Sequence, residues 1–233
     1  MKKNRYLLCI VILSLALMGN SQAELHGVKL KDFPANSILK TSINLTSEKE
    51  LGNIVILPNE IFNQQEAAHI IFRLDKLPPS LLAKINRNGI MIQLFTGKLT
   101  DNPTASHLSG MIPRGYVNNT TWDDVPGLGG GKTVLVKIGA SQKGNGHSSV
   151  NLELHELAHS IDMYIFNELR YNRDFLNIWD QEKDQLFPGK SYYLTYPEEY
   201  FAESFAYYYC GGQYRNELKR KAPLTYQLIN KLS

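Results

Sequence analysis

The chain has 233 residues and a formal net charge of +3, from 25 basic and 22 acidic side chains. Three of the basic residues, Lys2, Lys3 and Arg5, lie within positions 1–23, which hold no acidic residue, so positions 24–233 carry 22 charges of each sign. This balance excludes the strongly basic surface expected of a protein that binds nucleic acid or an anionic membrane.

Positions 1–23 have the pattern of a secretory signal peptide. The three basic residues precede an apolar run from Leu7 to Met18, and Ser21-Gln22-Ala23 has the small-x-small pattern of a signal-peptidase site. The apolar run is too short to span a membrane. We therefore expect a secreted, extracellular protein without a membrane anchor that begins at position 24.

Predicted strands precede most predicted helices along the remaining chain. Residues 24–49 are polar and weakly patterned, so we assign them no role. Apolar patterns and turn residues predict strands at 54–57, 90–95 and 134–138, and helices at 59–76, 80–87, 149–168, 173–185, from 197 and from 224.

This order predicts an α+β fold with a mixed N-terminal lobe, made of a small sheet plus helices, and a mainly helical C-terminal lobe. The length of 24–233 is compatible with a single domain whose cleft lies at the helix 149–168. We expect strand 134–138 to form the sheet edge that pairs with an extended substrate.

The predicted helix 149–168 contains the most informative motif of the chain. His155 and His159 are four residues apart, and Glu156 directly follows the first. Residues at this spacing share one helix face, so both imidazoles can reach one metal ion. Ser148 or Ser149 is the expected N-cap. The alternative is a helix with two surface histidines and no metal.

A third ligand is expected from the acidic helix that begins at Pro197. The long metzincin pattern is excluded, because its third histidine would fall at Ile165. Glu199 is the better candidate, and Glu203 lies four residues further on the same face, where it can accept a hydrogen bond from a ligating histidine. The alternative is an ordinary acidic helix start favoured by the helix dipole.

Such a site predicts hydrolysis of an amide bond. Zinc lowers the pKa of a bound water towards ~7 and polarises a carbonyl, and Glu156 is placed to move the proton to the leaving amine. A tyrosine hydroxyl can stabilise the developing oxyanion. Tyr192, Tyr193 and Tyr196 all precede the acidic helix, and their spacing does not distinguish them.

Several segments in the same order resemble one known family. The helix 155–162, the run PEEYFAESFAYYY at 197–209 and the stretch TWDDVPGLGG at 121–130 closely resemble the bacterial secreted Pro-Pro endopeptidases. These in turn resemble the catalytic domain of anthrax lethal factor, including a tail similar to 222–227. The resemblance implies a zincin-like metallopeptidase fold with one Zn²⁺ per chain.

The resemblance also implies roles for individual residues. These are zinc ligation by His155, His159 and Glu199, general base catalysis by Glu156, transition-state stabilisation by Tyr192, and support of a ligand by Glu203.

The family further implies a proline-rich peptide substrate, cut between two prolines in bacterial surface proteins. A loop before the Gly-rich stretch would cover the cleft with Arg114 and Tyr116, while Trp122 and Glu198 are further candidates for substrate contacts. Proline-rich peptides adopt a preformed extended helix that docks against aromatic rings, so the aromatic residues suit this substrate.

Two alternative interpretations concern nucleotide binding and a noncatalytic role. Gly131-Lys132-Thr133 matches the end of a phosphate-loop pattern, but the first glycine of that pattern would fall at Pro126 and a strand follows, so nucleotide binding is rejected. The glycines are instead expected to form a flexible connection. The alternative function is a noncatalytic, zinc-containing peptide-binding protein with the same fold, against which the complete set of catalytic residues argues.

Overall fold

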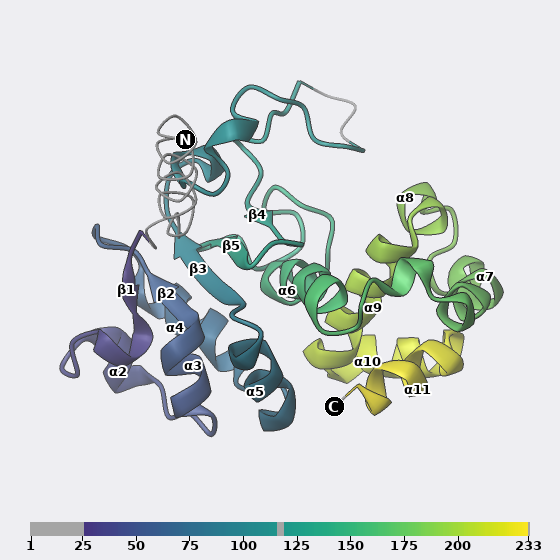
Figure 1. Cartoon of the computed structure of the whole chain (residues 1–233), viewed down its shortest axis with the longest axis horizontal. Coiled ribbons are helices and arrows are strands. Elements are labelled where there is room, and N and C mark those ends of the chain that lie inside the picture. The colour runs from purple at the N-terminus through teal and green to yellow at the C-terminus, as the bar shows by residue number, and fades with distance from the viewer. Residues whose placement is uncertain (1–25, 116–118, 233) are drawn as a thin grey trace, which may run out of the picture.

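A single mixed sheet of five short strands organises the N-terminal half of the protein (Figure 1). The computed structural model describes residues 26–115 and 119–232, so the predicted signal peptide and Tyr116 lie outside the described residues. In sheet order, the strands are β1 (Val28–Lys29), β2 (Val55–Leu57), β3 (Met91–Phe95), β5 (Thr133–Lys137) and β4 (Gly127–Leu128).

The three central strands run parallel, and the two edge strands run antiparallel to their neighbours. β2 is buried throughout, as are Ile92 in β3 and Val134 in β5. Branched apolar side chains on successive positions are typical of parallel strands covered on both faces. Helices gather beside these strands in Figure 1: α2 (Ile38–Ser42), α3 (Glu48–Ile54), α4 (Gln64–Leu74) and α5 (Pro79–Arg87).

The prediction that strand 134–138 forms the sheet edge was wrong. β5 lies between β3 and β4, and the two-residue strand β4 forms that edge. A strand of two residues that begins with a glycine has no alternating pattern, so sequence reasoning could not detect it.

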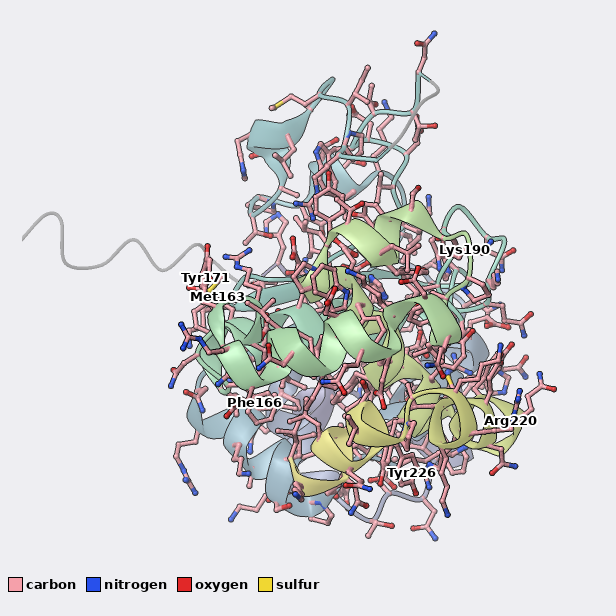
Figure 2. All side chains as sticks on the ribbon, turned by 90° about the vertical axis from the view of Figure 1, so that its right-hand side faces the viewer. Met163, Phe166, Tyr171, Lys190, Arg220 and Tyr226 are labelled. Atoms are coloured by element: carbon pink, nitrogen blue, oxygen red, sulfur yellow. The ribbon has the colours of Figure 1, made fainter. Side chains whose placement is uncertain are left out.

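Helices make up the C-terminal half, which faces the viewer in Figure 2 with Lys190, Arg220 and Tyr226 on its outer surface. Their bounds are α6 (Leu152–Tyr164), α7 (Arg173–Leu186), α8 (Ser191–Thr195), α9 (Pro197–Cys210), α10 (Gly212–Lys221) and α11 (Pro223–Lys231). The α+β prediction is therefore confirmed.

The pair α6 and α9 forms the centre of this half. Pro197 occupies the first turn of α9, where its missing N–H costs no hydrogen bond, and Gly211 follows the helix with a φ of 74°. Phe201 and Phe205 are fully buried, while the small side chains of Ala202 and Ala206 let α9 pack closely.

Two helix starts differ from the sequence predictions. The cap of α6 is Asn151, whose side-chain oxygen accepts a hydrogen bond from the Leu154 N–H at 3.0 Å, while Ser149 bonds to the backbone of Asn151 instead. α4 begins at Gln64 after the cap Asn63, later than predicted from periodicity. Within 26–115 and 119–232, no helix combines the length and apolar character needed to cross a membrane.

Candidate active site

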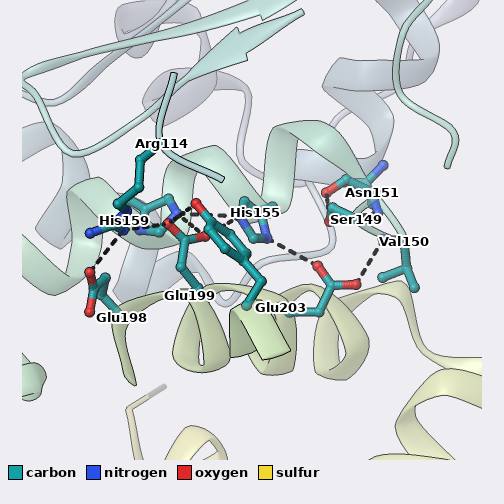
Figure 3. A network of polar contacts seen from close by, with 10 residues as sticks. Arg114, Ser149, Val150, Asn151, His155, His159, Glu198, Glu199 and Glu203 are labelled. Carbon is teal, nitrogen blue, oxygen red and sulfur yellow. Dashed lines mark hydrogen bonds and ion pairs between the residues drawn. The ribbon is translucent and has the colours of Figure 1, made fainter. Parts of the chain in front are cut away.

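Three donor atoms from two helices form a nearly equilateral triangle (Figure 3). The His155 and His159 Nε2 atoms lie 3.3 Å apart, and Glu199 Oε2 is 3.3 Å from the first and 3.4 Å from the second. Among the described residues, this is the group whose geometry suits a metal ion. The prediction that His155, His159 and Glu199 meet is confirmed.

Zinc fits this triangle in both chemistry and size. Two imidazole nitrogens and one carboxylate oxygen are a ligand set used by catalytic zinc sites. At ligand distances of roughly 2.0–2.1 Å, tetrahedral coordination separates ligand atoms by about 3.3–3.4 Å. Three protein ligands leave one coordination position for water or substrate, as a catalytic site requires.

The electrostatics of the triangle favour a positive charge within it. Burial opposes ionisation of Glu199, but hydrogen bonds from both imidazoles outweigh it and hold the pKa of that carboxyl well below its usual range. Burial likewise opposes the charged form of His155, yet Glu199 and Glu203 raise its pKa well above the ordinary value. Glu199 is therefore ionised at neutral pH, as a ligand must be.

Glu203 fixes the orientation of the first imidazole. Its Oε2 lies 3.0 Å from His155 Nδ1, and its Oε1 accepts a hydrogen bond from the Val150 N–H at 2.9 Å. When Nδ1 donates its proton to this carboxylate, the lone pair of Nε2 points into the triangle. The carboxylate is itself held in place because it is buried and bonded to the chain just before α6.

Tyr192 is the tyrosine of α8 that reaches the triangle. Its hydroxyl donates a hydrogen bond to Glu199 Oε1 at 2.8 Å. Burial and the nearby Glu199 carboxylate raise the pKa of Tyr192, so the hydroxyl keeps its proton at neutral pH. Tyr193 instead packs on Phe187 with ring centroids 4.6 Å apart. Tertiary structure thus distinguishes residues that the sequence spacing left equivalent.

The Gly-rich stretch packs directly on the turn of α6 that carries Glu156. A Cβ added at Gly127 would lie 2.9 Å from Glu156 Cγ, and one at Gly129 would lie 2.0 Å from the Glu156 carbonyl oxygen. The Gly130 N–H also donates to Ser160 Oγ at 3.1 Å. The expectation of a flexible connection was wrong, because these glycines permit the close approach of β4 to the half-buried Glu156.

A loop between β3 and β4 brings Arg114 onto the site. We call residues 96–126 the cleft loop; it rises above the sheet in Figure 1, and 116–118 lie outside its described part. The Arg114 guanidinium donates hydrogen bonds to Glu198 at 3.0 Å and to Glu199 at 3.2 Å. The guanidinium carbon, Cζ, lies 3.9 Å from the centroid of the Tyr196 ring. Glu198 therefore faces the cleft loop.

Trp122 and Asp162 make contacts with parts of the protein other than the donor triangle. Trp122 is half-buried and packs on a small apolar cluster of the cleft loop and adjoining strands, which includes Phe95 and Leu99. Asp162 accepts a hydrogen bond from the Leu169 N–H at 2.6 Å, beyond the end of α6.

Comparisons with known proteins agree with the site. The family model described as "Anthrax toxin lethal factor, N- and C-terminal domain" matches residues 42–232. A Pro-Pro endopeptidase of Paenibacillus alvei is 40% identical over 183 residues, 78% of this chain and 84% of the relative. A Pro-Pro endopeptidase of Clostridioides difficile (strain 630) is 42% identical over 185 residues, 78% of this chain and 83% of the relative.

The solved structure of the Pro-Pro endopeptidase from Paenibacillus alvei has a TM-score of 0.75 to this protein, with 40% sequence identity. The match covers 79% of this chain and 100% of that structure. The fold and the donor set therefore define a zinc metalloendopeptidase with a zincin-like α+β fold. Within that class, the chain belongs to the Pro-Pro endopeptidase family.

Proposed function

We propose that this protein is secreted and hydrolyses proline-rich peptides between two prolines in bacterial surface proteins. The observation that carries the proposal is the donor triangle of His155, His159 and Glu199, with Glu156 on the same helix and the Tyr192 hydroxyl 2.8 Å from the Glu199 carboxylate. The names of the two relatives support the Pro-Pro bond as the target.

Each residue around the triangle has a proposed task. Bound zinc supplies a Lewis acid for the substrate carbonyl and makes a water molecule acidic. Glu156 accepts the proton of the attacking water and returns it to the leaving proline nitrogen. Tyr192 donates a hydrogen bond to the oxygen of the attacked carbonyl. Glu203 keeps the lone pair of His155 Nε2 directed at the ligand triangle.

The edge strand β4 and the cleft loop are the proposed substrate-binding elements. β4 lies at the sheet edge against Glu156, where its backbone N–H groups can bond to carbonyls of an extended peptide. Prolines lack an N–H, so a Pro-Pro segment can only accept such bonds. Aromatic rings of Tyr192 and Tyr196 suit the apolar proline rings, and we propose Arg114, Tyr116, Trp122 and Glu198 as further substrate contacts.

Secretion rests on the sequence of positions 1–23 alone. We propose that this segment is removed and that 24–233 acts as one metallopeptidase domain of two lobes without a membrane anchor. Expression of the full chain in a bacterial host should then place the protein in the medium with Glu24 at its N-terminus. An N-terminus at Met1, or protein retained with the cells, would contradict secretion without affecting the catalytic assignment.

Cleavage is tested with a quenched peptide library containing Xaa-Pro-Pro-Xaa and matched Xaa-Pro-Ala-Xaa peptides. We expect zinc-dependent cleavage of the first set between the prolines, abolished by a chelator and lowered at least about 100-fold in Glu156→Gln. The control Glu217→Gln changes a carboxylate that pairs with Lys221 on α10. Peptide binding without cleavage would support a noncatalytic binding protein instead. A digest of bacterial surface proteins, analysed by mass spectrometry, then tests the proposed substrate.

A further inference from the structure

The Asp123 carboxylate ties three parts of the cleft loop together. Its Oδ1 accepts hydrogen bonds from Thr100 Oγ1 at 2.6 Å and Ser109 Oγ at 3.1 Å. Its Oδ2 accepts from the Gly110 N–H at 2.7 Å and from Thr121 Oγ1 at 3.0 Å. Each carboxylate oxygen therefore has two donors. Together, the four donors come from the start, the middle and the end of the cleft loop.

The backbone beside Asp123 completes this junction. The Asp123 carbonyl accepts a hydrogen bond from the Leu99 N–H at 3.2 Å, and the Trp122 N–H donates to the Met111 carbonyl at 2.8 Å. The Thr100 hydrogen bond is the largest of the effects that hold the pKa of Asp123 well below its usual range. The carboxylate is therefore ionised, and its hydrogen bonds are charge-assisted.

The described part of the loop beyond this junction rests on the active site. Arg114 lies three residues after Met111 and bonds to Glu198 and Glu199. Gly115 lies so close to Tyr192 that an added Cβ would be 2.8 Å from the ring. Arg114 has a side chain that is 52% exposed, so burial does little to hold it over the triangle. The backbone that leads to Arg114 starts at Met111, whose carbonyl is bonded to the Trp122 N–H beside Asp123.

We propose that Asp123 is a positioning residue for the peptidase reaction: its carboxylate sets the base of the cleft loop and thereby places Arg114 opposite Glu198 and Glu199. This proposal deepens the proposed function, because Arg114 is there assigned to substrate binding. Asp123 itself touches neither the ligand triangle nor Glu156 among the contacts of the described residues. Its effect should reach the substrate through Arg114.

The test compares Asp123→Ala with Asp124→Ala. The second variant removes the same charge one residue away, from an exposed side chain with no hydrogen bond or ion pair in the described structure. Loss of charge-assisted bonds at the loop base should raise KM for an Xaa-Pro-Pro-Xaa peptide about tenfold in Asp123→Ala, with kcat changed less than about threefold and zinc content unchanged. Asp124→Ala should match the wild type.

Asp123→Asn should rescue most of the effect. Its amide oxygen can still accept from the Gly110 N–H, while the hydroxyls of Thr100 and Ser109 can reverse their roles and accept from its NH₂ group. In an Arg114→Ala background, Asp123→Ala should raise KM by less than about twofold, because residues that act through one another are not additive. Fully additive effects would overturn the proposal.

A second readout does not depend on catalysis. Gly115 packs on the Tyr192 ring, so we expect trypsin to cut after Arg114 mainly when this segment moves away from the ring. Asp123→Ala should then speed cleavage of the Arg114–Gly115 bond at least about fivefold relative to the bond after exposed Lys190 (Figure 2). If the wild type cuts no Pro-Pro peptide, the proposed function fails while this readout still tests the role of Asp123.

If Asp123→Ala does not fold, Thr100→Val combined with Ser109→Ala decides the question. This variant keeps Asp123 and removes its two Oδ1 donors. We expect a KM about threefold higher and faster cleavage after Arg114, since the charge keeps only two of its four partners. Wild-type values for both measurements, or an Asp124→Ala variant with the same defects as Asp123→Ala, would overturn the proposal.

Discussion

The helix pair α6–α9 and the cleft loop meet at Glu199, but different forces hold them. α6 and α9 bury Leu157, Phe201 and Phe205 between and around them, so the ligands lie on packed elements with little freedom. The cleft loop shares a small apolar cluster with the adjoining strands. Hydrogen bonds of Asp123 connect parts of the loop to one another, and Arg114 connects the loop to α9.

This difference matches two separate tasks of the site, metal binding by the helices and substrate binding by the loop. A metal site requires ligand positions fixed to a fraction of an ångström, which tight helix packing provides. A substrate-facing loop must admit and release a peptide, and polar contacts near solvent exchange with water at a small net cost. We therefore expect changes on the helices to affect zinc and kcat, and changes on the loop to affect KM.

The largest effect is expected from His159→Ala. Removal of one of three ligands should lower zinc content from one per chain to a small fraction and reduce kcat/KM on the order of a thousandfold. Zinc analysis and peptide cleavage measure both quantities. Chelation should lower the melting temperature of the wild type and leave that of the variant unchanged. His107→Ala, at an exposed histidine, is the control. Full zinc retention in His159→Ala would contradict the expectation that the helix pair binds the metal.

Tyr192→Phe should act on the chemical step. Loss of the hydroxyl that lies 2.8 Å from Glu199 should lower kcat about 100-fold with zinc content retained, because an oxyanion donor is removed. Single-turnover kinetics with a saturating peptide separates this step from binding. The control is Tyr193→Phe, whose ring packs on Phe187. An equal loss of kcat in that control would assign the donor to the wrong tyrosine.

Gly129→Ala tests the close contact between the residue that follows β4 and Glu156 of α6. The new Cβ would meet the Glu156 carbonyl oxygen at 2.0 Å, so the strand or the helix must shift. We expect a loss of roughly 3 kcal/mol in the free energy of unfolding, at the upper end for overpacking. Urea denaturation measures it.

The matched control for Gly129→Ala is Gly131→Ala, where the nearest atom would be the Thr133 oxygen at 3.6 Å, an ordinary contact. Its effect should stay within about 0.5 kcal/mol. Equal stabilities of the two variants would restore the view of this stretch as a flexible connection.

Of the four substitutions His159→Ala, Tyr192→Phe, Gly129→Ala and Arg114→Ala, the last should have the smallest effect. It should change KM, and not zinc content, kcat or stability. Removal of a half-exposed guanidinium should raise KM about tenfold with kcat nearly unchanged, because the lost contacts belong to binding. Initial rates across a range of peptide concentrations measure the split, with the exposed Arg87→Ala as control. A drop in kcat with constant KM would show that the cleft loop takes part in the chemistry.

Local patterns in the sequence predicted much of the site. The spacing of four in His155–His159 and in Glu199–Glu203 places each pair on one helix face, because helix periodicity is set by neighbouring residues. The helices at 173–185 and from 197 were predicted within a residue or so of α7 and α9. The acidic helix was expected to supply Glu199 as the third ligand before the family resemblance was considered, and the resemblance implied the same ligand set. The zinc metalloendopeptidase prediction is confirmed.

Contacts between distant segments decided the rest. The edge position of β4, the choice of Tyr192 over Tyr193, and the four donors of Asp123 all depend on segments that meet only in the folded chain. No local periodicity encodes such meetings, since the energy that selects them comes from packing and from hydrogen bonds across the fold. The sequence by itself determined which residues can bind the metal, and the tertiary structure decided which surfaces approach it.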